Sequence, residues 1–154
     1  QPIDIQLPRV EVINDLLSDE QMNELHNRSD CYVSFSHSEG IGMGAVEAAL
    51  RDKPVIVTNY GGAPEYVKTP YMIDCELQEL EKDDFLFKKG MLWGNPNFDQ
   101  LLEFMRHAYD TRVRYMDHEH TKNLVGRENV LKEFILNVVG SENDKADEDS
   151  TTHH

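Results

Sequence analysis

Glu39 and Glu47 flank a glycine-rich segment whose sequence is EGIGMGAVE, with seven residues between the two carboxylates. Glycines let a ligand approach the backbone closely, because they carry no side chain. A glycine turn that opens a helix favours an anion, since the first amides of a helix lack partners and its N-terminus carries about half a positive charge. Carboxylates beside that turn can accept hydrogen bonds from sugar hydroxyls. The segment therefore predicts a site for a sugar-linked diphosphate.

The amides of Ile41, Gly42 and Met43 are expected where the loop becomes a helix, and there they can donate to a bound anion. Glu47 falls about one turn into that helix, and Glu39 precedes it at the carboxyl edge of the sheet. The two carboxylates are thus expected to bracket the anion rather than to share a helical face. A glutamate in a first helical turn also compensates the helix dipole, and the spacing by itself does not exclude that role for Glu47.

Alternating strands and helices surround this segment. The pattern predicts a strand at residues 31–35, a helix at 42–52 and a continuously apolar strand at 54–58, which is typical of a buried parallel sheet. The other predicted elements are a strand at 10–17, a helix from a Ser18 capping box to about Arg28, a short helix at 63–67 and a strand near 71–73. This order predicts an α/β fold, a Rossmann-like parallel sheet flanked by helices.

The remaining chain predicts less regular structure. A long acidic loop holds Trp93, and Asn97 or Asn95 can cap the helix that follows it. A final helix is predicted over about 122–139. Residues 140–154 are acidic and offer almost nothing to bury, which predicts a disordered tail that ends in tag-like histidines. We therefore expect one domain over residues 1–139 and a tail over 140–154.

Composition excludes several classes of function. The chain has 154 residues and a formal net charge of −14, without a cluster of lysines and arginines, so non-specific binding to nucleic acid is not expected. No apolar run approaches the roughly 18 residues that cross a membrane. Cys31 and Cys75 are expected to be reduced thiols, because no secretory leader is seen, and this predicts a cytoplasmic location.

The stretches SHSEGIGM (residues 36–43), KPVIVTNYGGAPE (53–65) and the Glu47-Ala48 pair resemble the C-terminal, donor-binding domain of retaining GT-B glycosyltransferases, often called glycosyltransferase group 1. The similarity in order and spacing runs from about Val10 to Val67. It implies one half of a GT-B fold. It also implies a nucleoside diphosphate sugar as the donor substrate, transfer with retention, and no cofactor or tightly bound metal.

The resemblance also implies roles for single residues. Glu39 would contact hydroxyls of the donor sugar and stabilise positive charge that develops at the anomeric carbon, which makes it the catalytic candidate. Glu47 would bind the ribose hydroxyls. The loop amides of Gly40, Ile41, Gly42 and Met43 would contact the sugar and diphosphate. The nucleobase would lie over the turn formed by Asn14, Asp15 and Leu16.

The same family usually carries an arginine and a lysine earlier in this domain, and an N-terminal domain that holds the acceptor. The chain begins too late to include them, so we expect an inactive fragment that needs its N-terminal partner. Two alternatives stay open, a noncatalytic interaction module with this fold and a dinucleotide-binding domain. The second is disfavoured because the glycines are Gly40, Gly42 and Gly44 rather than G-x-G-x-x-G.

Three other features give weaker indications of function. His37 is expected at the end of a strand, where it either lines the sugar pocket or forms surface hydrogen bonds. The DHEH run at residues 117–120 contains potential metal ligands, but consecutive residues point in different directions, so no metal site is predicted. Trp93 and Phe98 are expected to pack a loop onto the sheet, with an aromatic sugar platform as the alternative.

Overall fold

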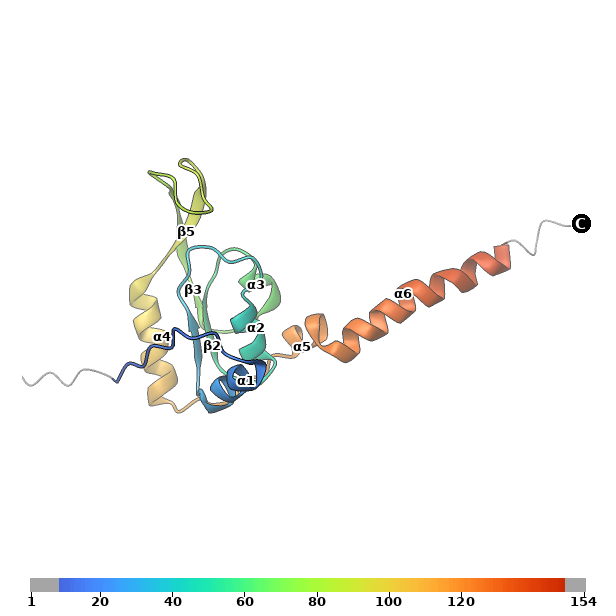
Figure 1. The fold of residues 1–154 in the computed structure, drawn as a ribbon, viewed down its shortest axis with the longest axis horizontal. Coiled ribbons are helices and arrows are strands. Elements are labelled where there is room, and N and C mark those ends of the chain that lie inside the picture. The colour runs from blue at the N-terminus through green and yellow to red at the C-terminus, as the bar shows by residue number, and fades with distance from the viewer. Residues whose placement is uncertain (1–8, 149–154) are drawn as a thin grey trace, which may run out of the picture.

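A computed structural model describes residues 9–148, with side chains up to residue 137. A three-stranded parallel sheet in the order β1-β2-β3 forms its centre, and a two-stranded antiparallel hairpin extends from one edge of it (Figure 1). In chain order the elements are α1 (Asp19–Arg28), β1 (Tyr32–Ser34), α2 (Met43–Ala49), β2 (Val55–Thr58), α3 (Ala63–Tyr66), β3 (Met72–Ile73), β4 (Cys75–Glu79), β5 (Leu92–Pro96), α4 (Phe98–Asp110), α5 (Glu119–Val125) and α6 (Arg127–Glu148). The predicted α/β, Rossmann-like fold class is confirmed.

The central strand β2 separates two apolar layers. All four of its residues are buried, because strand side chains alternate between faces and both faces are covered by helices. Val55 and Val57 pack with the alanines of α2, whereas Ile56 packs with Leu101 of α4. The sheet therefore lies between α2 and α4, and the loops that leave the carboxyl ends of its strands meet at one edge.

Helix α1 begins at the predicted capping box. The Ser18 hydroxyl accepts a hydrogen bond from the Gln21 amide, and the Gln21 side chain accepts one from the Ser18 amide at 2.8 Å. The predicted end at Arg28 is confirmed. Its buried residue is His26, whereas the apolar Leu25 is 43% exposed. The imidazole of His26 thus lies on the buried face of α1, directed toward α2.

The predicted strand at residues 10–17 is wrong. This segment is extended but unpaired, and Val10 and Val12 are 77% and 73% exposed. A strand is stable only when its backbone groups find a neighbouring strand, and among residues 9–148 none pairs with it. The sequence pattern of this segment is typical of a strand, but the described residues contain no neighbouring strand for it. Residues 1–8 lie outside the described residues.

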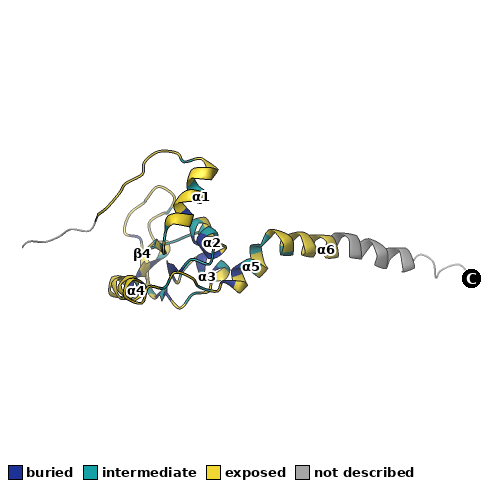
Figure 2. Cartoon of the chain, turned by 90° about the horizontal axis from the view of Figure 1, so that it is seen from below, coloured by how far each residue is buried: buried dark blue, intermediate teal, exposed yellow. Residues whose placement is uncertain are grey.

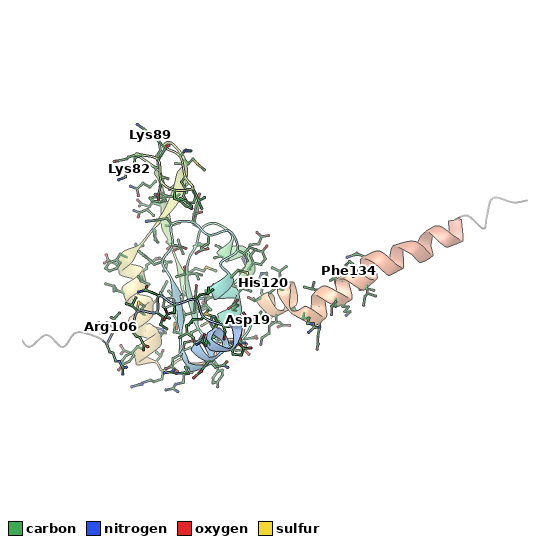
Figure 3. All side chains as sticks on the ribbon, viewed as in Figure 1. Asp19, Lys82, Lys89, Arg106, His120 and Phe134 are labelled. Carbon is green, nitrogen blue, oxygen red and sulfur yellow. The ribbon has the colours of Figure 1, made fainter. Side chains whose placement is uncertain are left out.

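The predicted irregular loop around Trp93 is also wrong. β4 and β5 pair in antiparallel fashion from Cys75 opposite Pro96 to Glu79 opposite Leu92, and residues 80–91 join them. The hairpin stands away from the body, and Figure 3 labels Lys82 and Lys89 near its tip. It begins directly after β3, so it rises from the same edge as the glycine loop.

The predicted helix at 122–139 is divided in two. The Gly126 amide donates to the Lys122 carbonyl at 2.8 Å, and an extended backbone at Gly126 ends α5 before α6 begins. α6 projects from the body and its described part is largely exposed (Figure 2). It continues through residues 140–148 of the predicted tail, and residues 149–154 lie outside the described chain. Within the described residues, no helix is both long and apolar enough to span a membrane.

Candidate functional site

The loop that contains Glu39 is held against a second glycine turn by backbone contacts. The Gly62 amide donates to the Glu39 carbonyl at 2.9 Å. A Cβ on Gly61 would lie 2.5 Å from the Glu39 carbonyl oxygen, and one on Gly62 would lie 1.5 Å from the Gly40 carbonyl oxygen. Gly61 also has a φ of 72°, which favours glycine. The two turns fit together because neither Gly61 nor Gly62 has a side chain, and this contact fixes the loop of the catalytic candidate.

The glycine loop enters α2 through Gly42, whose φ of 74° is left-handed. The Gly42 carbonyl accepts from the amides of Ala45 and Val46 at 2.9 and 3.1 Å, which starts the helix. Among the described residues, the amides of Ile41 and Met43 have no hydrogen-bond partner. α2 spans residues 43–49 rather than the predicted 42–52, because the chain turns after Ala49. The loop therefore offers free backbone donors at the start of a short helix.

Glu47 lies on α2 and faces α1. Its Oε2 is 3.0 Å from Nε2 of the buried His26, while 38% of the glutamate side chain stays exposed. Arg51 donates to the Glu47 backbone carbonyl at 2.7 Å. The histidine thus engages one carboxylate oxygen and orients the group, and the second oxygen remains available to a ligand.

The Tyr32 side chain lies near enough to both candidate carboxylates to be affected by their charges. Burial raises the pKa of Tyr32, and the negative charges of Glu39 and Glu47 raise it further. A Cβ on Gly44 would lie 2.5 Å from the Tyr32 hydroxyl, so the glycine makes room for it. The tyrosine ring also stacks on His26 with centroids 6.5 Å apart. Tyr32 is therefore a neutral neighbour that both carboxylates of the predicted site share.

His37 connects the glycine loop to the hairpin. Its Nδ1 donates to the Gly94 carbonyl at 2.9 Å, and its own carbonyl accepts from the Gly94 amide at 3.0 Å. The imidazole stacks on Trp93 with centroids 4.2 Å apart and planes 23° apart. Trp93 therefore packs the hairpin against the glycine loop, whereas the sequence predicted that it packs a loop onto the sheet.

The structure does not connect the other sequence candidates to this site. Asn14, Asp15 and Leu16 lie in the segment before α1, where Leu16 is fully exposed at 100%, and no hydrogen bond joins them to the glycine loop. In the DHEH run, His118 donates to the Lys53 carbonyl and His120 to the Glu65 carbonyl, each at 2.8 Å. Both histidine side chains thus bind backbone carbonyls of other segments. The described residues contain no cluster of three potential metal ligands.

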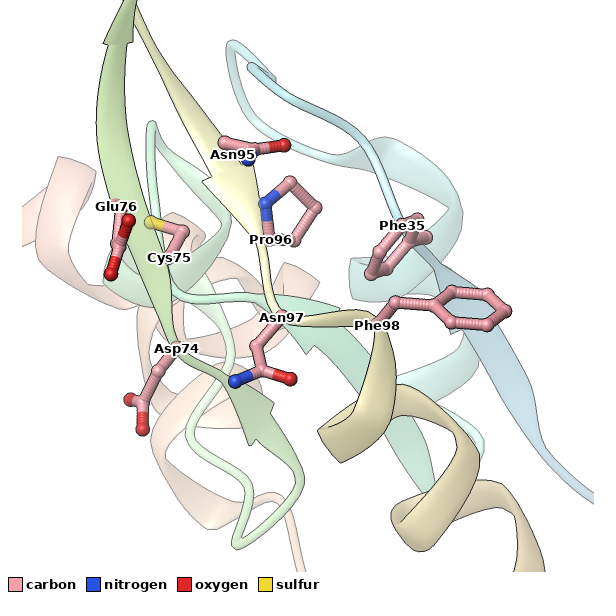
Figure 4. A pocket seen from close by; sticks show the side chains of 8 residues that line it. All are labelled: Phe35, Asp74, Cys75, Glu76, Asn95, Pro96, Asn97 and Phe98. Atoms are coloured by element: carbon pink, nitrogen blue, oxygen red, sulfur yellow. The ribbon is translucent and has the colours of Figure 1, made fainter.

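A pocket of about 570 Å³ opens at the carboxyl end of the sheet on the α4 side (Figure 4). Phe35 follows β1, Asp74 follows β3, and Phe98 begins α4, where it packs edge to face on Phe35 at 6.0 Å. Asn97 caps α4 through its side chain, as predicted. None of the residues that line this pocket is one of the predicted donor-binding residues, so it is separate from the glutamate pair.

Sequence reasoning missed His26, Tyr32 and the hairpin's Gly94 as parts of this arrangement. His26 and Glu47 are 21 positions apart on different helices, and Gly94 follows His37 by 57 positions. His26 follows the apolar Met22 by four positions, on the same face of the helix, and this spacing was the available signal. No sequence pattern marks the other two contacts.

Comparison with known proteins gives one result for this region. Residues 8–71 match the family model described as glycosyl transferases group 1. No curated protein matches the chain. The matched residues include α1, the glycine loop, both glutamates and the second glycine turn, and they support a role in glycosyl transfer. The predicted resemblance to the group 1 glycosyltransferases is thereby confirmed over residues 8–71.

Proposed function

We propose that this chain binds the donor, a nucleoside diphosphate sugar, for a retaining glycosyltransferase of the GT-B type. One observation carries the proposal. The family match over residues 8–71 covers the segment that contains Glu39, Glu47 and the free loop amides. A chance similarity would not require the second glycine turn at Gly61 and Gly62 to fit against the loop of Glu39.

In this proposal each group has a separate task. The second oxygen of Glu47 accepts hydrogen bonds from the ribose hydroxyls while His26 holds the first. The amides of Ile41 and Met43 donate to the sugar and diphosphate. Glu39 accepts from sugar hydroxyls and stabilises the positive charge that develops at the anomeric carbon, an effect felt mainly in the transition state.

A partner domain is part of the proposal. Transfer requires an acceptor held against the donor, and such positioning supplies up to about 7–11 kcal/mol of the barrier reduction. We propose that an N-terminal domain provides the acceptor site, so this chain alone is expected to transfer little sugar. Neither a cofactor nor a tightly bound metal has a task in this scheme, and the cytoplasm suits an enzyme that uses nucleotide sugars.

Ligand-dependent thermal unfolding tests the proposal. UDP or GDP should raise the midpoint of unfolding, because a ligand that binds only the folded state stabilises it. NAD at the same concentration is the matched control, since it also carries a diphosphate and ribose. Stabilisation by NAD alone would instead support a dinucleotide-binding domain, and no response to any of them would support a noncatalytic module.

A further inference from the structure

The hairpin formed by β4 and β5 is attached to the glycine loop through Trp93 and Gly94. The Gly94 carbonyl accepts a hydrogen bond from Nδ1 of His37 at 2.9 Å, and the Gly94 amide donates one to the His37 carbonyl at 3.0 Å. A Cβ on Gly94 would lie 2.8 Å from Cγ of Tyr60, and 3.0 Å from Sγ of Cys75. Tyr60 follows β2 and immediately precedes Gly61, which contacts the Glu39 backbone. The hairpin is thus packed against both loops that form the glutamate site.

This attachment determines the hydrogen-bonding state of His37. A carbonyl oxygen can only accept, so Nδ1 must carry the proton that it donates to Gly94. In the neutral ring Nε2 then carries a lone pair that can accept a hydrogen bond, and among the described residues it has no partner. Stacking on Trp93 fixes the ring plane as well. His37 therefore offers one oriented acceptor from the loop that contains Glu39.

We propose that Nε2 of His37 accepts a hydrogen bond from a hydroxyl of the transferred sugar, and that Trp93 and Gly94 are positioning residues for it. This inference rests on the proposed function, because it assigns the sugar side of the same donor site. The hairpin lies outside residues 8–71, which match the family model. Recognition of the sugar would thus depend on an element beyond the matched segment.

His37→Asn separates the two functions of the histidine. The asparagine amide can replace Nδ1 as a donor to Gly94, but it provides nothing at the position of Nε2. Affinity for UDP, GDP and ADP should stay within about twofold of the unmodified chain. Affinity for UDP-glucose, GDP-mannose or ADP-glucose, whichever binds, should fall about fivefold, the equivalent of one neutral hydrogen bond.

Trp93 provides both a second variant and a spectroscopic signal. It is the only tryptophan in the chain, so its indole N–H gives a single resonance, and this buried nitrogen has no hydrogen-bond partner in the described structure. The nucleotide sugar should shift that resonance more than the matching diphosphate does. Trp93→Ala should lose the same fivefold in sugar-dependent affinity, and Trp93→Phe, which keeps an aromatic face, should restore it.

The outcomes are distinguishable. If the unmodified chain binds neither diphosphates nor nucleotide sugars at millimolar concentration, the proposed function fails, and the assignment of His37 fails with it. If it binds both and His37→Asn retains the full affinity for the sugar-bearing ligand, only the assignment of Nε2 is wrong. Equal weakening of both ligands by His37→Asn would also overturn it, since that result indicates a displaced loop rather than a lost sugar contact.

Discussion

Replacing Gly62 with alanine should displace the loop that carries Glu39. The added Cβ would lie 1.5 Å from the Gly40 carbonyl oxygen, and real Cβ contacts are essentially never shorter than 3.0 Å. The difference, 3.0 − 1.5, requires a movement of at least 1.5 Å. The obstacle is backbone rather than the end of a flexible side chain, so no rotamer change can relieve it. The hydrogen bond from the Gly62 amide to the Glu39 carbonyl, now 2.9 Å, should be lost as well.

The expected loss of folding stability is about 1–3 kcal/mol, the usual range for overpacking a well-fitted contact. For a protein of this size each kcal/mol corresponds to roughly 2–4 °C in Tm, so the midpoint should fall by about 2–12 °C. Affinity for the nucleotide sugar should fall at least about tenfold, because more than one contact from the glycine loop is displaced. Circular dichroism melts and calorimetric titration measure the two effects.

Gly40→Ala is the matched control, since a Cβ at that position meets nothing within 4 Å. It adds the same methyl group on the other side of the contact without a clash, so the stability should be equal or up to about 1 kcal/mol higher. If Gly62→Ala melts at the same temperature as Gly40→Ala, the two turns do not constrain each other, and the role given to this contact is wrong.

Three further predictions concern single residues. Glu47→Ala should weaken binding of the preferred nucleoside diphosphate by about 1–3 kcal/mol in calorimetry; a folded variant with unchanged affinity would reduce Glu47 to a partner of His26. In the complete enzyme Glu39→Gln should lower kcat strongly and leave diphosphate affinity nearly intact, and wild-type turnover would remove Glu39 from the mechanism. Burial, followed by the charge of Asp30, raises the pKa of Cys31 from 9.0 to about 11. Its contribution to folding stability should therefore be complete below pH 9 and be lost as the pH rises to about 11. Urea unfolding across this range should show that loss flattened by Cys31→Ala, and an identical pH profile for the variant would contradict it.

The elements predicted correctly are those whose signals are local. The start of α1 is defined by the capping box between Ser18 and Gln21, and the start of α4 by the cap between Asn97 and Gln100. Each interaction joins residues only three positions apart. The continuously apolar β2 could be recognised because both of its faces are buried. In these cases the sequence itself contains the interaction that forms the element.

The errors arose where an element depends on a distant partner. Residues 10–17 were predicted as a strand, but pairing is a tertiary property, and residues 9–148 provide no neighbouring strand for them. β4 and β5 carry no strong apolar alternation, and their ladder depends on register across residues 80–91. The carboxylates of the candidate site were found from spacing, whereas the contacts of Glu47 with His26 and of His37 with Gly94 depend on how helices and hairpin pack.

The contact between His26 and Glu47 has a consequence for the thermodynamics of binding. A free glutamate side chain loses up to about 1.5–2 kcal/mol of rotamer entropy when it is held in one conformation. Here the buried histidine holds the carboxylate at 3.0 Å, so that entropy is lost when the chain folds and not when a ribose arrives. The site is therefore preorganised, and much of the ordering cost that usually weakens association has already been met. Loosening the histidine should leave the heat of binding nearly the same and make its entropy less favourable.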